Sequence, residues 1–421
     1  MQIQPLADAF VTVCESPDAA TIYTCSPGLT RCPSGRLVAT MGLRGPGVAA
    51  LPGPHYVRSA KACWQGKVFT SDDRGATWTH RADYPFLHAR PFVAGASLYV
   101  LGHASDLMIV RSDDEGHTWS TPVRLTHGQS WHQAPTNVHY ANGCVYLVME
   151  RRVRSAVRGW PVSELAPVLM RARVDDDLTR PESWAFADEL PFCGAVNDRE
   201  LDMFGVPFFD VFYAGRAVSL APGRECVPIG WLETNVVQFT DPDHYWHDPA
   251  GRTFHLWSRG HTGGTGYACI AKVVERDDGS MQTMLERAPS GKTMLFVPCP
   301  GGQMKFHVLY DHVTKLYWLL STQATDSMTR AERLDDERYN LPNNERQRLV
   351  LHFSRNMIDW CFAGLICAGP TQKQSRSYAS MVTDGDDLCI LSRSGDHRAA
   401  SAHDGNLVTF HKIPEFRKLV Y

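Results

Sequence analysis

The sequence predicts an all-β fold made of repeated four-stranded sheets, a β-propeller. The first observation is a repeat: residues 71–78 read SDDRGATW and residues 112–119 read SDDEGHTW, and the two copies begin 41 residues apart. That spacing is the length of one four-stranded blade. The second observation is that the apolar segments are short, rich in β-branched and aromatic residues, and bounded by turn residues. The third is that no long helical period competes with them.

Both copies of the repeat have the composition of a tight turn. The carboxylate of Asp73 or Asp114 can accept backbone N–H bonds inside the turn, and the glycine that follows can take a positive φ that a Cβ would oppose. The tryptophan that ends each copy can pack beneath the next strand. We therefore expect Asp73 and Asp114 to shape turns rather than to catalyse a reaction. Less complete copies follow at residues 175–184 and 354–360.

Strand-like segments continue along the chain, at residues 97–101, 144–149, 316–320 and 388–391. A last segment, Asn406–His411, is expected to pair with an N-terminal strand near Phe10–Val13 and so close the ring. Two stretches break the pattern. We interpret them as a long insertion near 194–230 and a charged insertion with some helical character near 326–348. The whole chain, 1–421, is predicted to form one propeller domain.

Composition excludes several classes of partner. The formal charge is −3, from 42 Lys and Arg against 45 Asp and Glu, so no global field suits nucleic acid. The N-terminal residues have neither a basic nor an apolar region, and no apolar run of about 18 residues follows, which predicts no membrane span. A cytoplasmic location is expected for the chain as given, and a secreted or periplasmic one if a leader was removed. The 12 cysteines form no C-x-x-C pair, so we expect reduced, mostly buried thiols.

The repeats resemble the Asp boxes of sialidase-like propellers, whose pattern is S-x-D-x-G-x-T-W. Further segments, in order along the chain, resemble the propeller superfamily of ulvan lyases, rhamnose-glucuronate lyases and related α-L-rhamnosidases. This resemblance implies seven blades, which we favour, while the chain length also allows six. The segments that carry it are 26–39, 131–135 (WHQAP), 231–237 (WLETNVV), 300–306 (PGGQMKF), 348–351 and 403–417.

The resemblance implies a central cavity in which His132 is the catalytic histidine and Arg259 neutralises a uronate carboxylate. His261 follows on a Gly-rich loop and is a third catalytic candidate. Such residues suit β-elimination, because the arginine acidifies the C5 proton and the histidine moves protons. The sequence thus predicts a carbohydrate-active enzyme for an acidic oligosaccharide or polysaccharide. Candidate substrate-binding residues are Arg44, His88, Arg152, Glu233, Asn235, Lys305, Arg376 and Tyr378.

The chain departs from that superfamily at two positions, which keeps other functions open. Arg151 and Arg152 stand where a second cavity histidine is expected, and residues 40–42 lack the first-blade histidine of the rhamnosidases. A sialidase, which is a glycoside hydrolase, would need three arginines, a tyrosine nucleophile with a glutamate partner, and an early R-I-P triplet. Residues 31–33 (RCP) resemble that triplet but lie too close to Gly35, so we interpret them as a hairpin turn.

A non-catalytic glycan-binding propeller is the third alternative, because a fold does not fix a function. No cofactor is predicted with certainty. A divalent cation, calcium or zinc, is compatible with the resemblance, but no spacing of ligand residues requires one.

Overall fold

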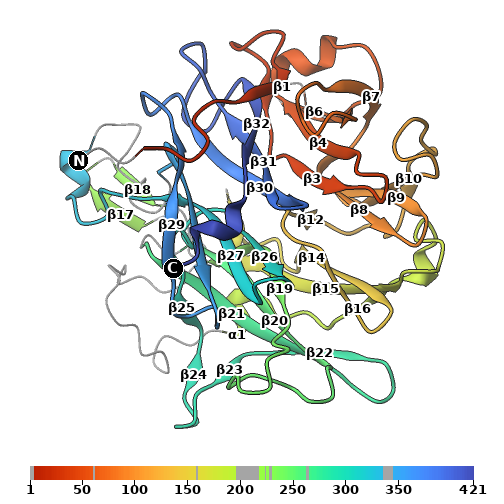
Figure 1. The fold of residues 1–421 in the computed structure, drawn as a ribbon, viewed down its shortest axis with the longest axis vertical. Helices are drawn as coiled ribbons and strands as arrows, with labels where there is room; N and C mark the ends of the chain where they lie inside the picture. The colour runs from red at the N-terminus through yellow and green to blue at the C-terminus, as the bar shows by residue number, and fades with distance from the viewer. Residues whose placement is uncertain are drawn as a thin grey trace.

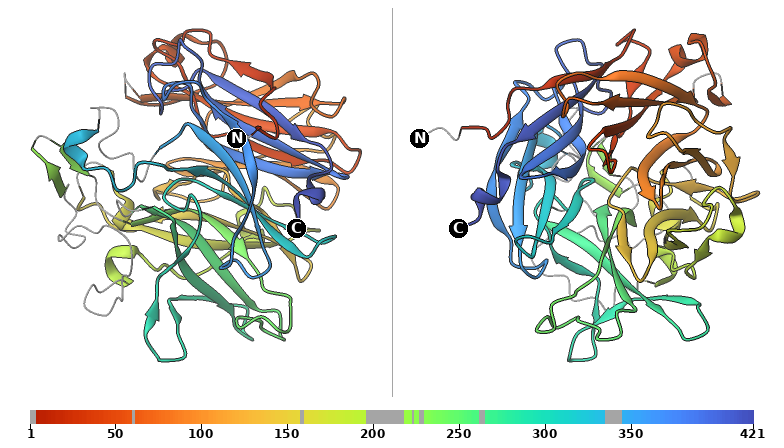
Figure 2. Two further views of the ribbon diagram at one scale, coloured as in Figure 1. Left: turned by 60° about the vertical axis from the view of Figure 1, so that its left-hand side comes forward. Right: turned by 45° about the vertical axis from the view of Figure 1, so that its right-hand side comes forward.

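The computed structural model describes residues 4–59, 62–157, 160–195, 218–222, 224–226, 230–261, 265–334 and 345–421. In this part of the chain, six antiparallel sheets of at least four strands follow one another around a ring (Figure 1, Figure 2). We number these sheets as blades 1 to 6. The prediction of an all-β propeller is confirmed.

The first three blades use the N-terminal half of the chain. Blade 1 contains β2 (Tyr23–Thr24), β3 (Gly28–Arg31), β4 (Leu37–Arg44), β5 (Tyr56–Ser59), β6 (Ala62–Ser71) and β7 (Thr79–Tyr84). Blade 2 contains β8 (Leu87–Ala94), β9 (Ser97–Ala104), β10 (Asp106–Ser112) and β11 (Val123–Arg124). Blade 3 contains β12 (Trp131–His132), β13 (His139–Ala141), β14 (Cys144–Arg152), β15 (Leu165–Arg173) and β16 (Ala185–Phe186).

The last three blades complete the ring. Blade 4 contains β19 (Gly230–Val237), β20 (Thr253–His261), β21 (Tyr267–Glu275), β22 (Met281–Met284) and β25 (Phe296–Pro298). Blade 5 contains β26 (His307–Asp311), β27 (Leu316–Gln323), β28 (Arg348–Ser354) and β29 (Cys361–Ala368). Blade 6 contains β30 (Arg376–Asp384), β31 (Asp387–Ser394), β32 (Leu407–Ile413) and β1 (Val11–Glu15). Smaller elements are α1 (Phe192–Ala195) and the pairs β17 (Val218–Ala221) with β18 (Arg224–Cys226) and β23 (Glu286–Arg287) with β24 (Thr293–Met294).

The preference for seven blades was wrong, and the alternative of six describes the structure. The physical reason is that much of the chain lies in connections rather than in strands. Residues 324–347 join β27 to β28, and residues 187–229 separate β16 from β19. The insertion predicted near 194–230 falls mostly outside the described residues. Of the charged stretch near 326–348, the described part contains one short 3₁₀ turn, Ala331–Arg333.

The ring closes as the sequence predicted. N-terminal strand β1 pairs antiparallel with C-terminal strand β32, with Val11 opposite Phe410 and Glu15 opposite Leu407 (Figure 1). Pairing the two ends of the chain in one sheet removes the exposed edges that an open ring would leave.

The core lies between neighbouring blades. In the contact of blade 3 with blade 4, Tyr146 stacks on Phe254 with ring centroids 4.3 Å apart. In the contact of blade 5 with blade 6, buried Trp318 packs against Phe416. Burial of these large apolar side chains stabilises the ring, because each removes a large area from water.

The two Asp boxes form matching turns. Thr77 donates from its backbone N to Asp73 Oδ1 at 2.8 Å and from Oγ1 to Oδ2 at 2.6 Å, and Thr118 does the same with Asp114. Gly75 has φ +92° and packs against Phe410 of the neighbouring blade. The expectation that these aspartates shape turns is confirmed.

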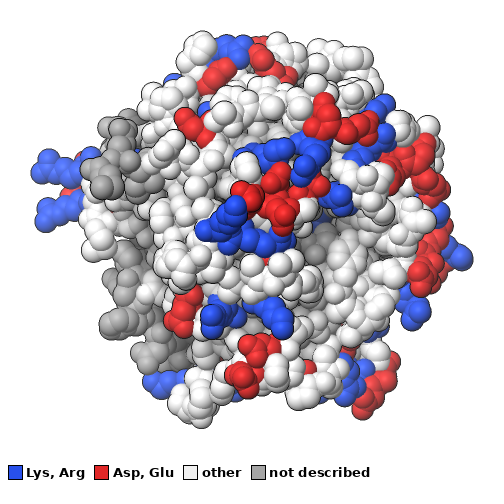
Figure 3. All heavy atoms as spheres, in the orientation of Figure 1, with Lys and Arg blue, Asp and Glu red and all other residues white. Residues whose placement is uncertain are grey.

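Residues 31–36 form the hairpin turn that was expected. Gly35 N donates to Cys32 O at 2.9 Å, and Gly35 has φ +98°. Arg31 donates to Asp384 of blade 6 at 2.9 Å, and acidic and basic side chains lie beside one another over the face shown in Figure 3. Arg31 therefore takes part in a surface ion-pair network.

The cysteines of the described residues are free thiols, most of them buried. No helix in the described part of the chain is long and apolar enough to cross a membrane.

Candidate active site

One cavity receives residues from five blades and, through Arg346, from the connection between β27 and β28 of blade 5. Its volume is about 660 Å³, and it opens where the innermost strands of the blades begin. The Asp-box turns follow β6 in blade 1 and β10 in blade 2, and they lie at the opposite end of the ring. Most of the predicted site residues line this cavity: Arg44, His88, His132, Arg152, Glu233, Arg259, His261 and Tyr378.

Arg259, Glu233 and Tyr378 form the centre of the site. Arg259 Nη1 donates to the Tyr378 hydroxyl at 2.9 Å and to Glu233 Oε2 at 3.3 Å. Arg259 Nε donates to the backbone carbonyl of Gln303 at 2.7 Å, which fixes the plane of the guanidinium. One nitrogen of Arg259 thus holds a phenol oxygen and a carboxylate oxygen close together. Desolvation acts to lower the pKa of Arg259, but Tyr378 and Glu233 together raise it above its usual value.

Two further arginines surround Tyr378. The guanidinium carbon of Arg346 lies 5.0 Å from the ring centroid of Tyr378, and that of Arg393 lies 5.2 Å from it. Both arginines are buried, and both line the cavity. Burial lowers the pKa of Arg393 to about 9, so it remains protonated at neutral pH. Nε and Nη2 of Arg393 have no hydrogen-bond partner among the described residues.

Arg346 and Arg393 were not among the predicted site residues. Arg393 ends the apolar run of β31, and Arg346 stands just before β28. Two features could have indicated these residues. A charged residue stands at the end of a buried strand, and a sialidase would need three arginines in its site. Neither feature distinguishes Arg346 and Arg393 from the other arginines of the chain, because the residues that surround them in the cavity come from distant blades.

The innermost strands of three blades are bent at the cavity. His88, Glu233 and Tyr378 have positive φ values of 53°, 56° and 52°. In each case the strand register shifts next to the residue, as in a β-bulge. A left-handed backbone at a non-glycine residue stores strain, which is characteristic of residues held for function. Each of these three side chains lines the cavity.

Arg44 and Arg152 are tethered at the cavity wall. Arg152 Nε donates to Glu164 Oε2 at 2.9 Å, and the same carboxylate accepts backbone N–H bonds from Ala156 and Val157. Arg44 forms an ion pair with Asp404. Because each of these two arginines is paired with a carboxylate, its positive charge is partly neutralised. Each therefore attracts an anionic ligand less strongly than Arg393 does.

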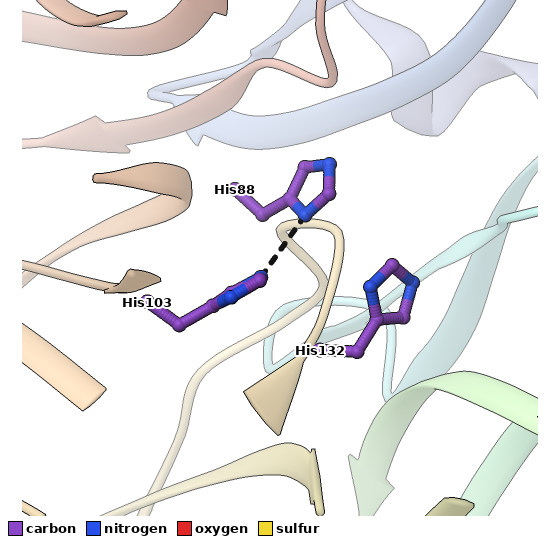
Figure 4. A group of neighbouring side chains, drawn as sticks. All are labelled: His88, His103 and His132. Carbon is purple, nitrogen blue, oxygen red and sulfur yellow. Dashed lines mark hydrogen bonds between the residues drawn. The ribbon is translucent and has the colours of Figure 1, made fainter. Parts of the chain in front are cut away.

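Three histidines gather beside this centre (Figure 4). His88 Nδ1 and His103 Nε2 are 3.2 Å apart and hydrogen-bonded, and the ring of His132 lies 5.3 Å from that of His88. Desolvation lowers the pKa of His132 to about 4 and that of His103 to about 3, so these rings are neutral at pH 7. His103 was not among the predicted site residues. His261 is buried at the cavity wall, and the Gly-rich residues 262–264 that follow it lie outside the described part.

Three predicted substrate-binding residues do not line the cavity. Lys305 is 1% exposed and donates to Ala379 O and Ser380 Oγ beneath the cavity floor. Asn235 bridges the backbone of Phe306 and Val308 and so ties blade 4 to blade 5. Arg376 donates to backbone carbonyls, one of them of Gly395, and its guanidinium lies over the ring of Phe10. All three satisfy buried polar groups of the framework.

No protein-family model matches the sequence, and no curated protein matches it. Among solved structures, the fold is similar to a Hadza microbial sialidase, Hz136, at 14% identity and a TM-score of 0.54, over 96% of this chain and 68% of that one. It is also similar to the intramolecular trans-sialidase from Ruminococcus gnavus, at 12% identity and a TM-score of 0.51, over 96% and 97% of the two chains. An α-L-arabinanase from Penicillium chrysogenum shares 12% identity, with a TM-score of 0.50, over 98% and 99%.

At such low identities the likeness shows the fold alone. The chain is an all-β propeller of the sialidase-like type. What its cavity does must be argued from the residues that line it.

Proposed function

We propose that this protein is a glycoside hydrolase that releases an acidic sugar from an oligosaccharide, with Tyr378 as its nucleophile. Glu233 accepts the phenol proton, and Arg259 holds the phenol and the carboxylate together. Arg346 and Arg393 bind the carboxylate of the sugar. This is the sialidase alternative of the sequence analysis rather than the β-elimination that was favoured there.

The observation that carries the proposal is the buried guanidinium of Arg393. Its Nε and Nη2 have no acceptor among the described residues, although the residue is only 4% exposed. Burying a charged donor without a partner costs free energy, and the forked guanidinium matches the two oxygens of a carboxylate. Because Arg393 lies over the ring of Tyr378, a carboxylate bound there would be held next to the phenol.

A phenol nucleophile suits such a substrate. When the carboxylate is attached at or near the anomeric carbon, an approaching carboxylate nucleophile would be repelled, whereas a neutral phenol would not. Tyr378 Oη attacks the anomeric carbon, Glu233 takes the phenol proton, and the glycosidic oxygen leaves and takes up a proton. Water then hydrolyses the tyrosyl glycoside, with its oxygen adding to the anomeric carbon and a proton returning to the phenol of Tyr378. Sialidases are the known exceptions to paired-carboxylate glycosidases in using tyrosine this way.

β-Elimination remains a second candidate on one observation. His132 and Arg259 line the same cavity, and a neutral imidazole can accept the C5 proton of a uronate. That reaction would give an unsaturated product that absorbs in the ultraviolet. Hydrolysis would not give such a product.

The test is an assay with three substrate classes: sialosides, uronate oligosaccharides and neutral arabinosides. We expect release of an intact sugar acid, no ultraviolet-absorbing product, and no turnover of the neutral glycoside. An unsaturated product would overturn the hydrolase in favour of the lyase. Binding of the acidic sugar without turnover would indicate a non-catalytic propeller.

A further inference from the structure

His88, His103 and His132 are held close together by three separate strands. Their ligating nitrogen atoms all lie within 4.8 Å of one another. His103 is the penultimate residue of β9 and lies directly opposite Leu87 in β8, and His88 lies in the bulge that follows Leu87. Trp131 N donates to Ser105 O at 2.9 Å, which fixes β12 and therefore His132 beside the end of β9. The backbone thus places three imidazoles at one point of the cavity wall.

The surroundings of these rings are those of ligands rather than of framework residues. Among the described residues, the one hydrogen bond recorded for the three rings is that between His88 and His103. The rings meet edge to face or tilted rather than stacked: His132 is T-shaped to His88 and to His103 (Figure 4). His88 and His132 are half-buried, so one side of the cluster faces the cavity.

From this geometry we propose that the three histidines bind one divalent transition-metal ion, with Zn²⁺ the best fit. Zinc takes imidazole nitrogens at about 2.0–2.1 Å, which puts two ligands of a tetrahedron about 3.3 Å apart. The separation of His88 Nδ1 from His103 Nε2 is 3.2 Å. The ligating nitrogen of His132 lies within 4.8 Å of those of the other two histidines, so it must move inward by up to about 1.5 Å, which a change of its side-chain torsions supplies. Calcium does not fit, because it takes oxygen ligands.

Three histidines leave a fourth position of the ion open, and here it faces the cavity. Zinc sites with three protein ligands and one open position hold water or a substrate atom there. Glu233 lines the same cavity as the three histidines, and at His132 its negative charge opposes the positive charge of Arg259. The site therefore takes an ion together with a water molecule or a sugar oxygen, and it does not depend on the proposed hydrolase activity.

The test uses the full chain, freed of metal with a chelator and then titrated with Zn²⁺ or Co²⁺ alone. We expect one Zn²⁺ per chain by elemental analysis after gel filtration, and visible Co²⁺ absorption of a four-coordinate site without the near-ultraviolet band of a cysteine thiolate. His132→Ala should weaken Zn²⁺ binding by at least about 100-fold, more than the loss of an outer-shell partner does. His127→Ala, an exposed histidine outside the cavity, is the matched control and should bind as the parent chain does.

His103→Gln provides a second variant in case an alanine change disturbs folding, which circular dichroism will show. Equal Zn²⁺ binding by the parent chain, His132→Ala and His103→Gln would overturn the proposal, as would a thiolate band in the Co²⁺ spectrum or no binding by the parent chain. Because these readouts need no substrate, an inactive enzyme that binds Zn²⁺ would refute the proposed function alone. An active enzyme that binds none would refute the metal site alone.

Discussion

The two ends of the propeller are built by contacts of very different reach. At the Asp-box end, Asp73 bonds to Thr77, four residues further along the chain. At the cavity end, Arg259 bonds to Glu233, 26 residues away, and to Tyr378, 119 residues away. A turn can therefore be recognised in a short segment of sequence, whereas the cavity exists only once the blades have closed into a ring.

Carboxyl groups at the two ends titrate in opposite directions. Hydrogen bonds from Thr77 lower the pKa of Asp73 to about 2. Desolvation raises the pKa of Glu150, which lies behind the cavity and accepts the backbone N–H of Thr234, to about 8. The fold thus favours the charged form of the Asp73 carboxyl at the turn end and the neutral form of the Glu150 carboxyl at the cavity end. This difference should be visible in the responses of the two ends to substitution and to pH.

The largest effect should come from Tyr378→Phe at the cavity end. Removing the proposed nucleophile should lower kcat by at least about 10³-fold while the circular dichroism spectrum is unchanged. Retention of more than a tenth of the parent kcat would exclude the phenol as nucleophile.

Arg393→Ala should act on binding. The loss of a charge-assisted contact of about 1.5–3 kcal/mol should raise KM for the acidic sugar about 10–150-fold, with a smaller change in kcat. Arg180→Ala, at a highly exposed arginine on another surface, is the matched control and should leave KM unchanged. An unaltered KM in Arg393→Ala would separate this arginine from substrate binding.

At the turn end, Gly75→Ala should lower stability rather than activity. A Cβ at this position would lie 2.1 Å from the ring of Phe410, at φ +92°, so we expect a loss of about 3 kcal/mol in the free energy of unfolding. Gly143→Ala also has positive φ but meets no atom within 4 Å, and should cost about 1 kcal/mol. Equal losses in denaturant titrations would mean that the close packing of blades 1 and 6 contributes nothing.

The most gradual effect should be a dependence of stability on pH. Because the pKa of Glu150 rises from 4.5 to about 8 on folding, the folded chain holds an extra proton between these values. Its contribution to stability is complete below pH 4.5 and is lost as pH rises toward 8, at about 1.4 kcal/mol per pH unit. Glu150→Gln should remove this slope. The same dependence of the free energy of unfolding on pH in Glu150→Gln and in the parent chain would contradict the buried neutral carboxyl, because the buried histidines contribute equally to both.

The same contrast explains how far the sequence could be interpreted. The Asp boxes, the strand repeat and the β1–β32 closure were predicted because short patterns encode them. The number of blades was not, because connections such as residues 324–347 take up chain length without forming a blade. Among site residues, His132 and Arg259 were candidates from the resemblance, and Glu233 and Tyr378 were candidate substrate-binding residues.

What the sequence could not supply was the grouping of these residues. Tyr378 was expected to bind substrate and Arg346 and Arg393 were not considered, because no local pattern relates β30, β31 and the start of β28. Lys305 and Asn235 were placed in the cavity although they tie blades together, since a buried polar residue looks the same in sequence whether it meets a ligand or a carbonyl. The structure resolves that ambiguity by showing which groups converge.

The most direct test of the account is to trap the sugar on the nucleophile. A sialic acid derivative with fluorine at the anomeric carbon and at the carbon next to it should transfer its sugar to the enzyme and slow the hydrolysis that follows. Peptide mass spectrometry should then find the added sugar on Tyr378, and Tyr378→Phe should remain unlabelled. A turnover-competent enzyme labelled on a carboxylate, or not labelled at all, would contradict the tyrosine mechanism.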